Sequence, residues 1–169
     1  MPTLPLRPLA VPLFVVAGLA LGGCAKPAPP TVKPVSMRAT SVSPERLQLA
    51  VELDVHNPNS FPLAVQSVTG LLSLDNGATL GAASAEPRTA LPAQASTAVT
   101  LNLDVPWQNL TALAPFALSG TDVPYRFNGT ARLGGDRLNT DVAFTLDGKL
   151  TRGQVIELGL RGLGAPAAR

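Results

Sequence analysis

The only histidine of this 169-residue chain, His56, is the residue whose type most readily does acid-base or metal chemistry. It follows Glu52 and Asp54 at intervals of two in the stretch VELDVH, so an extended strand would carry all three side chains on one face. Such a group could hold a metal ion or transfer a proton. The alternative is a solvated strand end, which is favoured because a structural zinc site needs four ligands and no cysteine is available for one.

The sequence lacks the motifs that would build an active site around these residues. No Gly-x-Ser-x-Gly elbow is present and no serine lies at a recognisable strand-to-helix turn, so His56 has no nucleophile to activate. The stretch GLRGLG near the C-terminus has the wrong spacing for a dinucleotide-binding loop. Glu52 and Asp54 have the spacing of solvated charges, not of an acid and a base in different environments. We therefore expect no enzymatic activity, no cofactor and no metal site.

Cys24 is the only cysteine, and its surroundings indicate lipid attachment. Residues 9–23 form an apolar run behind the basic Arg7, too short for a transmembrane helix of about 20 residues and typical of a signal peptide. A lone thiol in an exported protein needs an explanation, and the alternative to lipidation is an ordinary buried cysteine near a cleavage site. The run ends in residues that resemble the bacterial lipobox, whose cysteine is lipidated on sulfur and becomes the mature N-terminus: Leu21, Gly22, Gly23 and Cys24.

The lipoprotein resemblance implies a location as well as an anchor. Acyl chains on Cys24 would tether the mature protein to a membrane surface without spanning the bilayer. Lys26 stands where an aspartate would be the usual inner-membrane retention signal, so the resemblance implies the outer membrane of a Gram-negative envelope, with the protein facing the periplasm. Residues 1–23 are then the lipoprotein signal peptide.

Residues 24–40 follow the signal peptide with four prolines and no apolar periodicity. Prolines favour extended polyproline II at about 3.1 Å per residue, so the sequence predicts a semi-rigid tether of roughly 40 Å that holds the domain off the lipid. Three basic residues in the tether could contact anionic head groups: Lys26, Lys33 and Arg38.

The overall charge excludes one class of partner. The chain carries 13 basic and 11 acidic side chains, a formal net charge of +2. Without Arg7 of the signal peptide the balance falls to twelve against eleven, close to neutral. This gives no electrostatic case for binding nucleic acid.

Residues 41–158 have the length of one domain, and apolar residues alternate with polar ones through most of them. The period of two predicts half-buried strands over residues 47–56, 97–105, 123–133 and 138–150. Residues 65–84 predict a hairpin around Asn76-Gly77, because this pair tolerates positive φ angles. The residues expected to face inward are Leu47, Leu49, Val51, Leu53, Val55, Thr97, Val99, Leu101, Leu103, Val105, Val123, Tyr125, Phe127, Gly129, Ala131, Leu133, Leu138, Val142, Phe144, Leu146 and Leu150.

Only the stretch PWQNLTALAPF departs from this alternation. Pro106 at a first helical position, Trp107 and Leu110 three residues apart, and Pro115 as a breaker predict a short helix. Trp107 could bind a sugar or a partner, but a lone tryptophan at the start of an amphipathic helix is more often an anchor into the core. About seven strands and one short helix predict an all-β fold, an immunoglobulin-like or fibronectin-III-like antiparallel β-sandwich. Residues 159–169 are expected to be a flexible tail.

The stretch NPNSFP, residues 57–62, lies between two predicted strands and predicts a structural corner. Pro58 cannot donate to a strand ladder and so ends the pairing there. The short amides of Asn57 and Asn59 can bond backbone groups left open by the prolines and can tolerate left-handed conformations. Phe61 then returns an apolar side chain to the edge of the sandwich.

With these residues in view, VELDVHNPNSFPLAV resembles the signature of the late-embryogenesis-abundant type 2 family, also called the water-stress and hypersensitive-response (WHy) domain. Asn57, Pro58 and Asn59 carry the family triplet, and FNGTARL and VAFTLDGKL are similar to the closing strands, so the resemblance covers about residues 36–156. It implies a folded sandwich with a short helix, no catalysis, and a role in tolerance of drying, freezing or related stress. The lipoprotein leader is a departure, since many family members are cytosolic.

Two functions remain open. The first is a stress-protective protein whose neutral, polar surface makes weak contacts with exposed apolar patches on client proteins or lipids. The second is a scaffolding lipoprotein that docks on one envelope partner, for example by adding an edge strand. In both cases we expect a monomer that binds no nucleic acid.

Overall fold

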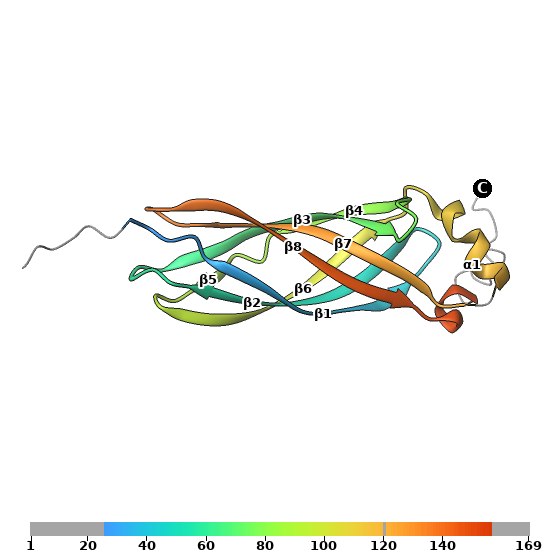
Figure 1. The fold of residues 1–169 in the computed structure, drawn as a ribbon, viewed down its shortest axis with the longest axis horizontal. Coiled ribbons are helices and arrows are strands. Elements are labelled where there is room, and N and C mark those ends of the chain that lie inside the picture. The colour runs from blue at the N-terminus through green and yellow to red at the C-terminus, as the bar shows by residue number, and fades with distance from the viewer. Residues whose placement is uncertain (1–25, 120, 157–169) are drawn as a thin grey trace, which may run out of the picture.

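The computed structural model describes residues 26–119 and 121–156, which form two antiparallel β-sheets packed face to face (Figure 1). Six of the strands have 12 residues, so at the usual rise per residue the sandwich is about 40 Å long. The strands of the described residues are β1 (Thr31–Val42), β2 (Arg46–Asn57), β3 (Leu63–Leu74), β4 (Thr79–Ala85), β5 (Thr89–Leu91), β6 (Ala95–Pro106), β7 (Val123–Gly134) and β8 (Asn139–Leu150).

The strand order confirms the predicted sandwich. One sheet has the order β1-β2-β6 and the other β4-β3-β7-β8, the three-plus-four arrangement of fibronectin type III domains. The short β5 pairs with the first residues of β3, beyond the stretch of β3 that pairs with β4. The structure thus has eight strands in its described part where about seven were predicted, and the three-residue β5 is one that the sequence pattern did not indicate.

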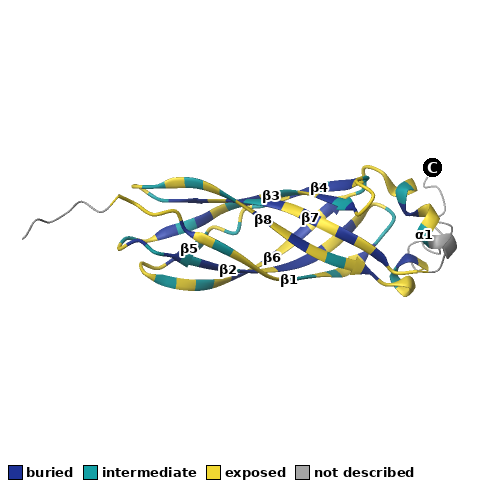
Figure 2. Ribbon diagram, viewed as in Figure 1, coloured by how far each residue is buried: buried dark blue, intermediate teal, exposed yellow. Residues whose placement is uncertain are grey.

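Burial follows the predicted alternation along the strands, as the banding in Figure 2 shows. The inward-facing residues of β2 and β7 are buried, and the two inner faces form one apolar cluster. Thr97, Leu138 and Val142 are half-buried because they lie toward strand ends or sheet edges. Gly129 leaves room on the inner face for the rings of Phe127 and Phe144, whose centroids lie 6.2 Å apart.

The predicted tether over residues 24–40 is wrong from Thr31 onward, and the domain begins before residue 41. Strand β1 pairs with β2 along its length, from Thr31 opposite His56 to Val42 opposite Leu47. Pro34 is tolerated because β1 is an edge strand, where a missing N–H costs no ladder bond, and the register shifts beside it. Lys33 and Arg38 are therefore strand residues and not part of a spacer.

The predicted helix is shifted toward the C-terminus. Pro106 does not start a helix; it ends β6 opposite Arg46. A single 3-10 turn, η1 (Leu110–Leu113), leads into the short helix α1 (Ala114–Ser119), so Pro115 lies in the first helical turn, where its missing N–H is harmless, and does not break the helix.

The two ends of the sandwich differ (Figure 1). At one end, here called the base, the chain enters at residues 26–30 beside the loops of residues 58–62, 92–94 and 135–138. At the other end, the tip, lie residues 43–45, 75–78, 107–119, 121–122 and 151–156, including η1 and α1. In the described residues no helix is long and apolar enough to cross a membrane.

Candidate functional site: the Asn-Pro-Asn corner

The Asn-Pro-Asn triplet lies at the base, where β2 ends and the chain turns into β3. Asn57 is fully buried and Asn59 is 6% exposed, and apart from the hydroxyl of Tyr125 they carry the buried polar side-chain groups of the described residues. Buried amides need partners, because an unpaired one costs about 1–3 kcal/mol. The corner is therefore the place in the described core where polar contacts decide the structure.

Asn57 joins the corner to the loop between β5 and β6. Its Nδ2 donates to the carbonyl oxygen of Phe61 at 2.9 Å, of Pro92 at 3.2 Å and of Leu91 at 3.3 Å. Its Oδ1 accepts from the backbone N and from Nδ2 of Asn59, each at 3.1 Å. One side chain thus links the ends of three strands.

Asn59 joins the corner to the N-terminal segment. The backbone N of Ala28 donates to Oδ1 of Asn59 at 2.8 Å, and Nδ2 of Asn59 donates to the Ala28 carbonyl at 2.9 Å. The two bonds reproduce what a neighbouring strand would offer, and we call this pair the Ala28 clamp. The carbonyl of Asn59 also accepts from the backbone N of Gln94 at 3.0 Å.

These contacts engage Nδ2 and Oδ1 of both amides within the protein, so the corner acts as a structural junction. Asn57 bonds nearby backbone at Phe61 and Asn59, as predicted, whereas the backbone partner of the Asn59 side chain is the distant Ala28. The tolerance of left-handed conformations is not used, because the described non-glycine residues with positive φ are Arg88 and Gln94.

Sequence reasoning missed the partners of the corner. The carbonyls of Leu91 and Pro92 belong to a loop that carries no motif. Ala28 had a signal that could have been used: in the stretch PAPP, residues 27–30, it is the one residue with a backbone N–H. The single donor in that stretch is the one that Asn59 binds.

Two small hollows flank the corner at the base. One of ≈ 260 Å³ lies between the N-terminal segment and the triplet, lined in part by Lys26, Pro58 and Asn59. The other, of ≈ 310 Å³, is lined by Ser60, Phe61, Pro62, Asp136 and Arg137. The guanidinium of Arg137 lies 5.6 Å from the ring centre of Phe61, a cation–π contact that holds a positive charge at the rim.

The structure places His56 at the solvated end of β2. Its Nδ1 lies 3.3 Å from Oγ of Ser96 on the neighbouring strand, while Glu52 accepts a hydrogen bond from Ser36 at 2.9 Å. The three residues share one face as predicted, but no group of three or more possible metal ligands occurs among the described residues.

Trp107 anchors the tip, outside any helix. Its Nε1 donates to the carbonyl of Ser43 at 2.8 Å, and its backbone N donates to the carbonyl of Glu45 at 3.2 Å. The ring is half-buried and packs against the core. The anchoring role is the one this geometry supports.

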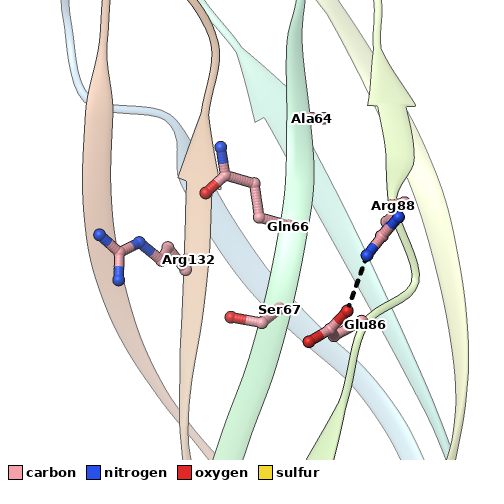
Figure 3. Close-up of a pocket in the computed structure, with 6 residues that line it drawn as sticks. All are labelled: Ala64, Gln66, Ser67, Glu86, Arg88 and Arg132. Atoms are coloured by element: carbon pink, nitrogen blue, oxygen red, sulfur yellow. Dashed lines mark hydrogen bonds and ion pairs between the residues drawn. The ribbon is translucent and has the colours of Figure 1, made fainter.

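A shallow depression of ≈ 520 Å³ lies on the outer face of the second sheet (Figure 3). In Figure 3, Gln66 and Ser67 project from β3, with Arg132 of β7 to one side and the ion pair of Glu86 and Arg88 to the other, 3.1 Å apart. Ser67 is the one residue lining the depression that carries a hydroxyl, and no histidine lines the depression to act as its base. The depression therefore lacks a nucleophile and base pair.

One buried titratable group stands apart from the corner. Burial raises the pKa of Tyr125 from 10.0 to about 12, and its hydroxyl is buried without a hydrogen-bond partner. The ring lies against Gly148 of β8. A neutral, unpartnered phenol in the core is a packing feature and offers no catalytic acid near neutral pH.

The lipobox residues Leu21, Gly22, Gly23 and Cys24 lie outside the described residues, as do residues 159–169 of the predicted tail. The lipid-attachment site therefore stays a prediction.

Comparison with known proteins places the chain in a family. Residues 52–155 match the family model described as late embryogenesis abundant protein. No curated protein matches the chain. The similar solved structures include a protein from Archaeoglobus fulgidus (TM-score 0.54, 13% identity, 70% of this chain and 97% of that one) and one from Arabidopsis thaliana determined in solution (TM-score 0.56, 18% identity, 75% and 83%). At these identities both show the fold alone.

The fold and the corner define a fibronectin-III-like β-sandwich that carries, at its base, an Asn-Pro-Asn turn with two buried asparagines. Because the matched region spans more than half of the sequence, the chain belongs to the late embryogenesis abundant type 2 family, and the resemblance of its signature is confirmed. It is a stress-related protein of the late-embryogenesis-abundant type, in a family that is generally non-enzymatic.

Proposed function

We propose that this chain is a non-enzymatic, lipid-anchored protein of the bacterial envelope that protects neighbouring proteins or membranes during drying or related stress. The observation that carries the proposal is the family match over residues 52–155. The family supports the stress-related role. The lipobox resemblance at Cys24 supports a lipid anchor, and Lys26 two residues later supports a location at the periplasmic face of the outer membrane.

The surface of the domain supports weak and general contacts. The described residues hold ten basic and ten acidic side chains, so the domain has no net charge that would select one partner. The four ion pairs found among the described residues are solvent-exposed and therefore contribute little to stability or to partner choice. Such a surface can lie against many drying proteins and separate their apolar patches, without a dedicated binding site.

The absence of catalysis is part of the proposal. The corner amides are occupied by internal bonds, and the depression around Ser67 lacks a base. His56 lies beside Ser96 at a solvated strand end, and the described residues contain no group of three or more His, Cys, Asp or Glu side chains that could hold a metal ion.

The second candidate function, a scaffold that adds a partner's strand to a sheet edge, has weaker support. Edge strands β1 and β8 lie close to each other, so each limits access to the other. Strand β1 also carries Pro34 and two register shifts, features that discourage edge-to-edge pairing. Docking on one envelope partner through another surface stays an outcome that the test below can reveal.

The test uses the mature chain with Cys24→Ser, so that lipid does not confound the assay. An unrelated, aggregation-prone enzyme is dried and rehydrated with this protein, with an equal mass of albumin, or with an unrelated β-sandwich. Light scattering and recovered activity are then measured. We expect protection at near-stoichiometric ratios that exceeds both controls, for several unrelated clients.

Protection no better than that given by the unrelated sandwich would contradict the protective role for soluble clients. Capture of a single saturable partner by crosslinking in intact cells, at an interface of standard size, would then favour the scaffold.

A further inference from the structure

We propose that the base of the sandwich is a membrane-contact surface: the Ala28 clamp holds it against the anionic head groups of the bilayer in which Cys24 is anchored. This inference rests on the proposed lipid anchor and adds an orientation and a contact surface to it. The surface consists of Lys26 and the loops of residues 58–62 and 135–138.

The clamp shortens the free chain between Cys24 and the folded domain. Without the clamp, the tether would run from Cys24 to the start of β1 at Thr31. The clamp fixes the backbone of Ala28 to Asn59 by two hydrogen bonds of 2.8 and 2.9 Å, and Pro30 is buried behind it. Only four residue steps then separate Cys24 from a point fixed on the domain, a span of at most about 14 Å.

The position of the clamp decides which end of the sandwich lies near the lipid. The clamp lies at the base, and the opposite end of the sandwich is about 40 Å away along strands of 12 residues (Figure 1). A lipid anchor within about 14 Å of the clamp brings the base to the head groups, because a fixed point cannot move farther from the anchor than its chain allows.

The distribution of charge distinguishes the base from the tip. The base carries two cations, Lys26 and Arg137, against Asp136. The described tip carries Arg152 against three carboxylates, those of Glu45, Asp75 and Asp122. The sides between them hold the remaining seven cations and six anions. A negative membrane surface therefore attracts the base and repels the tip.

Side chains at the base are arranged to present this charge. The cation–π contact with Phe61 holds the Arg137 guanidinium at the rim of the hollow that Ser60 and Pro62 also line. Lys26 is exposed on the other side of the corner. The two cations flank the Asn-Pro-Asn turn, so one surface combines the anchor point with both charges.

The experiment uses the full lipidated chain, purified from the envelope and reconstituted in vesicles of phosphatidylethanolamine with one quarter phosphatidylglycerol. Because Cys24 is the only cysteine and is blocked by lipid, an introduced cysteine can be labelled alone. Fluorophores are placed in three proteins: Ser60→Cys at the base, Thr100→Cys on a sheet face and Gln108→Cys at the tip. Quenching by head-group spin-labelled lipid is measured for each.

We expect the label at residue 60 to be quenched several-fold more than the labels at residues 100 and 108. The preference should weaken in high salt or without phosphatidylglycerol, while the protein stays bound to the vesicles. Equal quenching at all three positions would overturn the proposal, and strong quenching at residue 100 would show a domain lying flat, which also overturns it.

Two variants test the clamp itself. Asn59→Ala should reduce quenching at residue 60 while circular dichroism shows a folded sandwich. A Gly-Ser linker inserted between Ala25 and Lys26 keeps the clamp but lengthens the free chain, so it should reduce quenching as well. The same linker inserted after Asn76 in the tip hairpin is the matched control and should change nothing. Unchanged quenching after the insertion before Lys26 would contradict the proposal.

Mass spectrometry of the same preparation separates this inference from the function on which it rests. An unlipidated Cys24 would refute both the anchor and the membrane-contact surface. A lipidated Cys24 with no positional difference in quenching would refute only the orientation and leave the proposed envelope protectant standing.

Discussion

Replacing Asn57 with alanine is expected to destabilise the domain more than any exposed asparagine substitution. Asn57 is fully buried and makes five hydrogen bonds, three through Nδ2 and two through Oδ1. Alanine removes the buried partner of the Leu91 carbonyl and of two N–H groups of Asn59, and the partly buried partner of the Phe61 and Pro92 carbonyls. The variant therefore leaves several buried polar groups unpaired at once.

The magnitude follows from those contacts. A typical internal hydrogen bond contributes about 1 kcal/mol net, and a buried group left unpaired costs about 1–3 kcal/mol. Three carbonyls share the two hydrogens of Nδ2, so the bonds are not independent, and we expect a loss of about 3–5 kcal/mol. That is a large part of the ~5–15 kcal/mol that stabilises a domain of this kind.

The assay is urea denaturation followed by the fluorescence of Trp107, the only tryptophan, which lies at the tip and so reports unfolding of the whole sandwich. Asn57→Asp is the matched isosteric variant: it keeps acceptors but turns an oxygen toward three carbonyls, so it should destabilise at least as much. The exposed Asn102→Ala should stay within about 0.5 kcal/mol of wild type. A loss for Asn57→Ala no larger than for Asn102→Ala would refute the junction role.

Three further predictions concern other parts of the structure. Tyr125→Phe should leave stability unchanged or raise it by about 1 kcal/mol, because it removes a buried hydroxyl without a partner. Since burial raises the pKa of Tyr125 to about 12, its contribution to stability is fully present below pH 10 and is lost as the pH rises through about 12, and the phenylalanine variant should lack this loss. Gly129→Ala should cost about 1–3 kcal/mol, because its Cβ would meet the ring of Phe144. Asn59→Ala should abolish the hydrogen-exchange protection of the Ala28 amide.

Each of these has a control within the chain. For Gly129→Ala the control is Gly153→Ala, whose Cβ has no neighbour closer than 4.0 Å and which, in a helical turn, should be neutral or slightly stabilising. For Asn59→Ala, amides in the β2–β6 ladder should keep their protection, and equal loss everywhere would show global unfolding instead of a released clamp. If Tyr125→Phe were markedly less stable than wild type at neutral pH, the Tyr125 hydroxyl would have a hydrogen-bond partner, which would contradict the structure.

The strand faces could be predicted because alternation is a local signal. In β2, Val51 and its neighbours at intervals of two are buried as expected, since one face of a strand must pack on the opposite sheet. Strand β1 was missed for the opposite reason. Its Pro34 and the three prolines just before it are typical of an extended tether, and only its pairing with β2, including Val32 opposite Val55, makes it a strand.

The corner was predictable in kind but not in its partners. The triplet indicates amides that satisfy nearby backbone, yet the groups they bind lie 31, 34 and 35 residues away in sequence. Those distances close only when both sheets are assembled. The predicted start of the helix was wrong for a similar reason, since a distant contact decided the structure. Pro106 is favourable at a first helical turn, but its pairing opposite Arg46 extends β6 through that position.

The most direct test of the account is survival of drying in the cell that makes this protein. A strain lacking the chain is complemented with wild type, with Cys24→Ser carrying an unchanged signal peptide, or with Asn57→Ala as a folding control, and viability and aggregated envelope protein are measured after drying and rehydration. We expect that only wild type restores viability and keeps envelope proteins soluble. Full rescue by Cys24→Ser, or no loss of survival in the deletion strain, would contradict a protectant that acts from a lipid anchor.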